Sequence, residues 1–357
     1  MLGPPEPPEL KTGEISSLLF KHEREWVDMQ PFLLSVGYKL RPRYDPNWFP
    51  SWGNTYVTEE PHEDALSSMR SDVLDAIRIV DNQRVVLKRI ETNSREIKII
   101  RYLSQIQDPR NHTIPLLDVI PLPPDNSCSL LVTPYTRRFN HPAFHCRAEY
   151  VEAMQQFLEG LQFMHDHGVS HFDIAPQNMM MDESRVVPAG SHFTSPKSHT
   201  GYPGIFSWNN RCSVSPVRYY YIDFGLSMYF RKGKDAALTT GTLRTFNTIP
   251  ELSLTVPYNP FKVDIFQLGL TMHKLIDTYP ALKPFRPVAD RMTSTDPNDR
   301  PEPAESLQEL NWIANQIPPQ KLRAPIVEKT GGVSYIARSA MSMVRRDSPR
   351  QERYQGY

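Results

Sequence analysis

The chain has 357 residues, and its 40 basic and 40 acidic side chains give a formal net charge of zero. This length is enough for one large domain or two modest domains, each with a substantial apolar core. The cancelled charge leaves no electrostatic footprint for nucleic acid or for an anionic membrane, so we expect neither as a partner.

The cysteine pattern indicates an intracellular protein. Cys128, Cys146 and Cys212 do not have the spacing of metal ligands, and an odd number leaves one thiol outside any disulfide. Reduced thiols are typical of intracellular proteins. No window approaches 18 apolar residues, and the first residues lack a basic segment followed by an apolar one. We therefore expect no membrane span and no signal peptide.

Residues 1–65 are predicted to form an N-terminal extension. Residues 1–13 are rich in proline and charge and are expected to be disordered. An apolar period typical of a helix covers about 14–36. Residues 41–53, RPRYDPNWFPSWG, cannot form a regular element, because each of the three prolines lacks an N–H donor and restricts the residue before it. The aromatic residues of this segment are expected to pack on another surface.

Residues 66–135 predict a small α+β unit. Two β-like runs, VLDAIRIV from Val73 and RVVLKRI from Arg84, are joined by the turn-prone residues 81–83. A helix over about 94–105 follows, and then two short apolar runs, IPLLDVIPL and CSLLVTPY. The predicted order is therefore strand, strand, helix, strand, strand.

Residues 136–318 predict a helical unit. Apolar residues recur along one face of a long helix from about 151 to 164, and Gly168 follows its end. Residues 183–217 are rich in Ser, Gly, Pro and His without a period, which predicts an excursion on the surface. A short strand at 218–223 and helices near 261–278 and 303–316 complete the unit. Residues 319–357 are expected to form a basic, disordered tail with a candidate phosphorylation site at 345–349.

The strongest functional signal is HFDIAPQN at 171–178, followed by Asp-Phe-Gly at 223–225. Phosphoryl transfer needs a carboxylate to orient the attacking hydroxyl and hard oxygen ligands to hold Mg²⁺ on the phosphates. Asp173 and Asn178, five positions apart on one loop, can supply the carboxylate and one ligand. Asp223, at the end of a strand, can supply the other, and Gly225 is expected to permit the sharp turn after it.

In these motifs the chain resembles the eukaryotic protein kinase family over about residues 70–315, and most of all the divergent kinase-like proteins of mushroom-forming fungi. The resemblance implies an α+β, bilobal fold with a small β-rich N-lobe and a larger helical C-lobe. It also implies ATP and Mg²⁺ as cofactors, with Asp173 as the catalytic base and Asn178 and Asp223 as metal ligands.

The resemblance further implies that Lys88 pairs with the ATP phosphates and with Glu96 on the next helix. Asn93 lies three residues before Glu96, so a capping box is a second expected role for this glutamate. Other residues assigned to the nucleotide site by the same resemblance are Val73, Val86, Ser68, Ser71 and Met180. The residues expected to support the site structurally are His171, Phe224, Gly225, Glu251, Asp264 and Arg300.

The chain departs from the family pattern at five places. Two are short intervals, of eight residues between Lys88 and Glu96 and of 36 residues between Asp264 and Arg300. The other three concern the phosphate loop and the catalytic loop. The stretch 66–73, LSSMRSDV, has no glycine where bare backbone N–H groups normally approach the phosphates, so the small Ser68 and Ser71 are expected to take that place. Phe172 replaces an arginine that grips a phosphorylated activation segment, so we expect no such control through Thr239, Thr240 or Thr242. Ala175 replaces a lysine of serine/threonine kinases, although Pro176 after it is typical of them.

Three functions remain open on these residues. The first is a protein kinase that transfers a phosphoryl group from ATP to an unknown protein substrate, with serine or threonine favoured over tyrosine. The second is a pseudokinase that acts as a nucleotide-binding or interaction module, which the altered phosphate loop supports. The third is a small-molecule kinase of the aminoglycoside/choline type, but those enzymes generally lack the pair predicted between Glu251 and Arg300.

Overall fold

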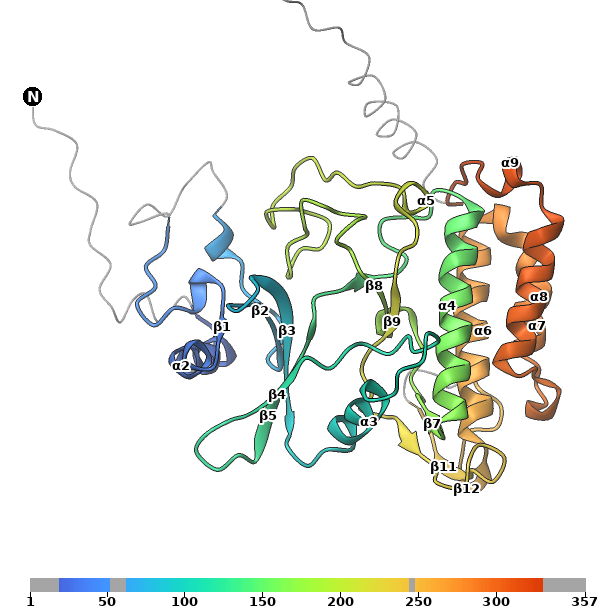
Figure 1. Cartoon of the computed structure of the whole chain (residues 1–357), viewed down its shortest axis with the longest axis horizontal. Coiled ribbons are helices and arrows are strands. Elements are labelled where there is room, and N and C mark those ends of the chain that lie inside the picture. The colour runs from blue at the N-terminus through green and yellow to red at the C-terminus, as the bar shows by residue number, and fades with distance from the viewer. Residues whose placement is uncertain (1–18, 52–61, 244–247, 330–357) are drawn as a thin grey trace, which may run out of the picture.

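The computed structural model describes residues 19–51, 62–243 and 248–329. Two lobes lie side by side in Figure 1, with a sheet in the smaller lobe and a helical bundle in the larger lobe, which confirms the predicted α+β, bilobal fold. The expected disorder of residues 1–13 and the candidate phosphorylation site at 345–349 lie outside the described residues. Within the described ranges, no helix is both long enough and apolar enough to cross a bilayer.

The smaller lobe is built on a five-stranded antiparallel sheet in the order β1-β2-β3-β5-β4. Its strands are β1 (Tyr38–Lys39), β2 (Val73–Arg78), β3 (Gln83–Glu91), β4 (Asp118–Pro121) and β5 (Cys128–Pro134). The lobe also contains helices α2 (Lys21–Ser35) and α3 (Arg95–Ser104). The predicted order of strand, strand, helix, strand, strand is confirmed, and Asn82, at φ 55°, takes the left-handed conformation in the β2–β3 turn.

Helix α3 begins at a different cap from the one predicted. The side chain of Ser94 accepts a hydrogen bond from Ile97 N at 3.4 Å, so Ser94 rather than Asn93 is the N-cap. The face that α3 turns to the core carries Ile97, Ile100 and Leu103. Glu96 in the first turn is therefore not engaged in the capping box predicted with Asn93.

The larger lobe is a bundle of α4 (Arg147–Asp166), α6 (Pro260–Thr278), α7 (Arg286–Met292) and α8 (Pro303–Gln316), with short helices α5 (Arg211–Val214) and α9 (Pro319–Leu322). The predicted apolar face of α4 is confirmed, because Met154, Phe157 and Leu161 are fully buried in the main core. Gly168, at φ 71°, ends this helix. The larger lobe also contains short strands, which are β6 (Arg137–Arg138), β7 (Val169–Ser170), β8 (Met179–Met181), β9 (Tyr219–Tyr221), β10 (Met228–Tyr229), β11 (Thr239–Gly241) and β12 (Ser253–Tyr258).

The N-terminal extension is part of the smaller lobe. Strand β1, which the sequence did not predict, pairs with β2 and forms one edge of the sheet. Tyr44 and Trp48 are buried, which agrees with the predicted packing of the aromatic segment, whereas Phe49 is exposed. The N-terminal extension and the N-lobe, which the sequence divides at residue 65, therefore share one sheet.

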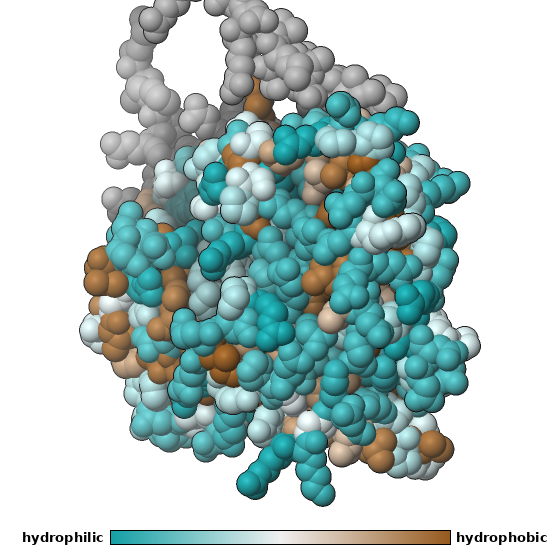
Figure 2. Space-filling model, turned by 45° about the vertical axis from the view of Figure 1, so that its right-hand side comes forward, coloured by the Kyte–Doolittle hydropathy of each residue, from teal (hydrophilic) through white to brown (hydrophobic). Residues whose placement is uncertain are grey.

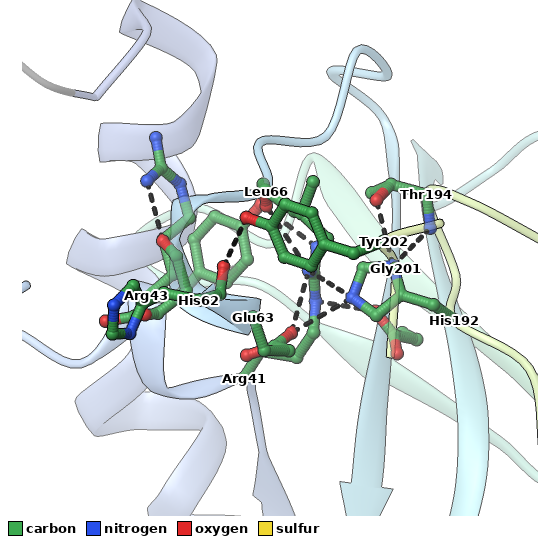
Figure 3. Close-up of polar contacts among 12 residues, drawn as sticks. Arg41, Arg43, His62, Glu63, Leu66, His192, Thr194, Gly201 and Tyr202 are labelled. Atoms are coloured by element: carbon green, nitrogen blue, oxygen red, sulfur yellow. Dashed lines mark hydrogen bonds and ion pairs between the residues drawn. The ribbon is translucent and has the colours of Figure 1, made fainter. Parts of the chain in front are cut away.

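Residues 183–217 pack onto that extension. Figure 3 shows His192 and Arg41 meeting the carboxylate of Glu63, at 3.1 Å from His192 Nε2 and 3.2 Å from Arg41 Nη1. The hydroxyl of Tyr202 donates to the carbonyl of His62 at 2.5 Å. Gly201, at φ 96°, lies where an added Cβ would stand 2.0 Å from a methyl carbon of Leu66. The predicted excursion is thus a clasp between the lobes rather than a free surface loop.

The described part of the predicted basic tail is ordered. After α9, Ile326 is buried, and its N–H donates to the carbonyl of His145 at 2.8 Å. Pro325 forms a β-bridge with Cys146. Residues 319–329 therefore belong to the packed part of the larger lobe, which corrects the predicted disorder at this point.

The view in Figure 2 shows a mostly hydrophilic face with apolar residues in small groups, as is ordinary for a globular surface.

Helix α2 is held to the lobe by a buried ion pair. Glu23 accepts hydrogen bonds from Arg43 Nε at 2.9 Å and from Tyr44 Oη at 3.2 Å. Burial alone would raise the pKa of Glu23, but the hydrogen bonds from Arg43, Phe20 and Tyr44 together with the charge of Arg43 outweigh this effect and lower the pKa. The carboxylate therefore stays ionised inside the lobe.

Glu23→Ala is expected to lower the free energy of unfolding by about 3–5 kcal/mol, because it leaves Arg43 charged, buried and without its carboxylate. Urea denaturation measures the change. The matched control is Glu25→Ala on the same helix, whose pair with Arg89 has a glutamate side chain that is 43% exposed. That control should cost about 1 kcal/mol or less. Equal costs for the two variants would show that Arg43 does not depend on Glu23.

Candidate active site

Lys88 joins two carboxylates from different parts of the chain. Its Nζ lies 2.8 Å from Glu96 Oε1 on α3 and 2.9 Å from Asp223 Oδ1 after β9. Burial lowers the pKa of the Lys88 ammonium, but the charges of Glu96 and Asp223 outweigh burial and raise it. The predicted contact between Lys88 and Glu96 is present, and the eight-residue interval between them is long enough for it.

Asp173 and Asn178 are hydrogen-bonded to each other within the loop 171–178. Asn178, the last residue of the 3₁₀ turn Pro176–Asn178, donates from Nδ2 to Asp173 Oδ2 at 2.8 Å and to the carbonyl of Asp173 at 2.9 Å. The pKa of Asp173 is raised, first by burial and also by the charge of Asp223, although His171 and Asn178 oppose the shift. The raised pKa suits a carboxylate that accepts a proton.

The pKa of Asp223 moves the other way. Burial would raise it, but the charge and hydrogen bond of Lys88 outweigh burial, so the pKa of Asp223 is lowered. Two nearby carboxylates thus have pKa values pushed apart by their surroundings. Such a separation is typical of a site in which one group accepts a proton and the other remains an anion.

The backbone is strained at two positions of the site. Phe172 has φ 65° and Asp223 has φ 66°, a region that non-glycine residues rarely occupy. The sequence assigned the sharp turn to Gly225, but the left-handed residue is Asp223 itself. Glycine at 225 leaves room for the neighbouring carboxylates, because an added Cβ would lie 3.3 Å from Asp223 Oδ1 and 3.6 Å from Glu96 Oε2. Such strain persists only where the surrounding structure enforces it.

Asp264 on α6 supplies much of that enforcement. Its side chain is 0% exposed and accepts hydrogen bonds from the backbone N–H of His171 at 2.9 Å and of Phe172 at 2.7 Å. The ring of His165 contacts the same carboxylate at 3.0 Å. Asp264 therefore holds the backbone of the loop at His171 and Phe172, in line with the structural role expected for it.

Gln267, one turn further along α6, was missed by sequence reasoning. Its Oε1 accepts from Ile174 N at 2.8 Å, and its Nε2 donates to the carbonyl of Phe172 at 3.3 Å. The only available signal was its spacing of three residues from Asp264, which puts both side chains on one face of the helix. Together the two residues hold the backbone on both sides of Asp173.

His171 connects the two motifs. Its ring lies 5.1 Å from the ring of Phe224, centroid to centroid, and its Nε2 donates to the carbonyl of Ile222 at 3.1 Å. Phe224 is fully buried in the main core. The predicted packing of His171 on Phe224 is thus present, and it fixes the position of Asp223 relative to Asp173.

The residues assigned to the base of the nucleotide are carried by both lobes. Val73 lies directly opposite Lys88 in the β2–β3 pair, and Val86 is two residues before Lys88 on β3. Because side chains alternate along a strand, these three share one face of the sheet. Met180 lies in β8, two residues after Asn178, and is partly buried.

The segment that replaces the glycine-rich loop is bound to α2. The ring of His22 donates to the carbonyl of Ser68 at 2.7 Å, and Trp26 Nε1 donates to the carbonyl of Ser71 at 3.2 Å. Ser68 is buried, and its Oγ accepts from Arg70 N at 3.2 Å. The Ser68 side chain is therefore enclosed by the protein, and its place beside the phosphates stays a prediction. Ser71 is exposed and lies two residues before the start of β2.

The predicted pair of Glu251 and Arg300 is formed. Arg300 Nη2 donates to Glu251 Oε2 at 2.8 Å, and the side chains are 0% and 10% exposed respectively. The guanidinium also donates to the carbonyl of Lys262 at 2.9 Å and lies over the ring of Phe266. Arg300 thereby ties the segment after β11 to α6.

The oxygen donors at this site fit a magnesium ion. Among the described residues, Asn178 Oδ1 and Asp223 Oδ2 accept no hydrogen bond from the protein. The Asp223 side chain is 46% exposed, so its carboxylate is accessible. Amide and carboxylate oxygens are the ligand type that Mg²⁺ prefers.

Comparisons with known proteins agree with this geometry. The family model described as "Protein kinase domain" matches residues 69–296, which is more than half of the chain. A probable casein kinase II subunit alpha homolog of Encephalitozoon cuniculi is 22% identical over 204 residues, which cover 55% of this chain and 52% of that protein. The eIF-2-alpha kinase GCN2 of Schizosaccharomyces pombe is 27% identical over 128 residues, 35% of this chain and 7% of that protein. The chain thus spans about half the length of the first relative and a small part of the second.

Arg300→Ala is expected to lower the free energy of unfolding of the larger lobe by about 3–5 kcal/mol, because Glu251 loses its partner in a mostly buried position. Thermal and urea denaturation measure the loss. The matched control is Arg291→Ala, whose pair with Glu309 is exposed, with the arginine side chain 54% accessible. A melting profile like that of the parent chain for Arg300→Ala would exclude a stabilising role for the pair.

Proposed function

This chain belongs to the protein kinase family, and on that premise we propose that it transfers the γ-phosphoryl group of ATP to a hydroxyl of a protein substrate. The observation that carries the proposal is that Lys88 contacts Asp223 and Asn178 contacts Asp173, while the packing of His171 on Phe224 joins the two motifs. Serine or threonine is favoured over tyrosine as the acceptor, because Pro176, which follows Ala175 inside the catalytic loop motif, is typical of serine/threonine kinases.

Each side chain has a separate task in this proposal. Lys88, fixed by Glu96, would bind the α- and β-phosphates, and Asp173 would orient the acceptor hydroxyl and take its proton. Mg²⁺ held by Asn178 and Asp223 would neutralise phosphate charge. Val73, Val86 and Met180 would pack on the base. The proposed partners are ATP and a protein substrate, and the free state of all three cysteines supports an intracellular location.

A second function, a pseudokinase that binds nucleotide without transfer, is favoured by one observation. The segment before β2 is tied to α2 through Ser68 and Ser71 instead of forming a glycine-rich loop. Exposed Arg70 is the one residue of this segment that we propose as a phosphate contact. A small-molecule kinase is less well supported, because the Glu251–Arg300 pair braces a segment used to bind peptides.

Lys88→Met and Asp173→Asn are each expected to abolish transfer from labelled ATP to generic protein acceptors, because one removes the phosphate-binding cation and the other the proton acceptor. The matched control is Lys98→Met, which removes an exposed lysine of α3 and should leave transfer unchanged. Binding of Mg-ATP is followed by thermal shift in the same samples.

The outcomes of that experiment separate the candidate functions. A Mg-ATP shift in the parent chain without any transfer would favour the pseudokinase. Transfer to a panel of small alcohols but not to proteins would favour the small-molecule kinase. Full transfer by Lys88→Met would show that another cation holds the phosphates and would overturn the assignment of Lys88.

We also propose that the activation segment is held without phosphorylation. Phe172 stacks on Tyr258 at a centroid distance of 6.3 Å and an interplanar angle of 16°, and Tyr258 Oη donates to the carbonyl of Gly241 at 2.8 Å. The apolar cluster around Phe172 also contains Ala175, Leu243, Ile249, Val263 and Phe266. Apolar packing thus occupies the place where the family arginine binds a phosphate.

Thr240→Ala and Thr242→Ala, singly and together, are expected to leave the rate of transfer unchanged, because no arginine at position 172 receives a phosphate there. Phe172→Ala is the contrasting variant and should destabilise the segment by about 3 kcal/mol and lower the transfer rate. Initial rates and melting temperatures are measured for each variant. A large loss of rate in the threonine variants alone would contradict phosphorylation-independent packing.

A further inference from the structure

A second group of reactive side chains lies away from the active site, where α4 begins. His145, Cys146, Glu149 and Cys212 each offer one ligand atom, and these four atoms all lie within 4.8 Å of one another. Cys146 and Glu149 are buried, and His145 and Cys212 are partly exposed. The sequence did not reveal the cluster, because Cys212 in α5 is more than 60 residues from the other three and the cysteines alone have no metal-ligand spacing.

We propose that this cluster is a structural zinc site with ligands from His145, Cys146, Glu149 and Cys212. Two thiols and an imidazole form a donor set typical of Zn²⁺. With Zn–S at about 2.3 Å and Zn–N at about 2.0–2.1 Å, a tetrahedral ion separates sulfur from nitrogen by roughly 3.6 Å. Cys212 Sγ lies 3.7 Å from His145 Nδ1, which is close to that separation.

The carboxylate of Glu149 orders the two segments that carry the ligands. Its Oε2 accepts from His145 N at 2.7 Å, and its Oε1 accepts from Cys212 N at 3.0 Å. Each carboxylate oxygen has a second lone pair, so one oxygen can still complete a four-coordinate site. Hydrogen bonds of this kind fix ligand direction before the ion arrives.

Arg211 completes the surroundings. Its Nη1 lies 3.5 Å from Glu149 Oε2, and its Nη2 donates to the carbonyls of Phe139 and Pro142, each at 2.7 Å. Binding of Zn²⁺ to the two thiols releases two protons and leaves the net charge of the buried group unchanged, since two thiolates balance the ion. The pair of Glu149 and Arg211 is neutral in both states.

The place of the cluster in the fold explains what an ion would do. Cys146 is the N-cap of α4, and Cys212 lies where the clasp 183–217 returns to the larger lobe. The backbone carbonyl of His145 also accepts a hydrogen bond from Ile326 N at 2.8 Å. A metal here would therefore fasten three segments that are remote in the sequence. All four positions are filled by the protein, as in structural rather than catalytic zinc sites.

The test is metal binding by the full-length, reduced chain. Metal analysis after purification should give one zinc per chain, and Co²⁺ added to the metal-free chain should produce thiolate-to-cobalt charge-transfer absorption. Cys146→Ser and Cys212→Ser should each abolish stoichiometric binding. Cys128→Ser is the matched control, because Cys128 lies in β5 of the other lobe, and it should bind as the parent chain does.

Two results would overturn the proposal. The reduced parent chain could show no cobalt charge-transfer band, a measurement that does not depend on whether any variant folds. Alternatively, mass spectrometry of the chain purified without reductant could find Cys146 and Cys212 linked with the loss of two hydrogens and no metal, which would make the pair a disulfide. Glu149→Gln separates ligand from scaffold, and about 10–100-fold weaker binding is expected for it.

Discussion

The buried carboxylate of Asp264 is the constraint on which the rest of the active site depends. It accepts the backbone N–H groups of His171 and Phe172 and so holds Phe172 in a left-handed conformation that this residue does not adopt on its own. A carboxylate that is buried away from water is tolerated only when its oxygens accept hydrogen bonds from the protein. The requirement works in both directions, because the loop satisfies Asp264 while Asp264 shapes the loop.

The position of each functional group follows from that brace. Because Asp264 fixes the loop, Asp173 lies within hydrogen-bonding distance of Asn178, and His171 packs on Phe224. Phe224 carries Asp223 with it, and Asp223 reaches Lys88 on the opposite lobe. One helix in the larger lobe thus determines where a lysine of the smaller lobe finds its partner.

Much of the fold could be predicted from the sequence, because local patterns determine most of its elements. The strands β2 and β3, the turn at Asn82 and the helices α4, α6 and α8 followed from periodicity and turn residues alone. Strand β1 could not be predicted, because two residues carry no pattern. Ile326 is buried only because the chain after α9 returns to the start of α4, and no local signal announces such a contact.

The candidate site was predicted in its residue types but not in all of its geometry. Motif spacing placed Asp173, Asn178 and Asp223 together, whereas the strain at Asp223 rather than at Gly225 depends on packing around the turn. The burial of Ser68 could not be predicted locally either, because its carbonyl accepts a hydrogen bond from His22 of α2, 46 residues earlier in the chain. Contacts of that range are decided by the folded core and not by neighbouring residues.

The clasp has a mechanical consequence. Arg84 on β3 stacks on Tyr135 in the connection between the lobes and donates to the carbonyl of Ser191, while the far end of the same segment is anchored beside α4 through Arg211. A chain attached at both ends across a hinge resists rotation of one body against the other. If nucleotide enters and product leaves between the lobes, as the proposed function requires, the rates of both steps would be limited by how far the clasp 183–217 lets the two lobes separate.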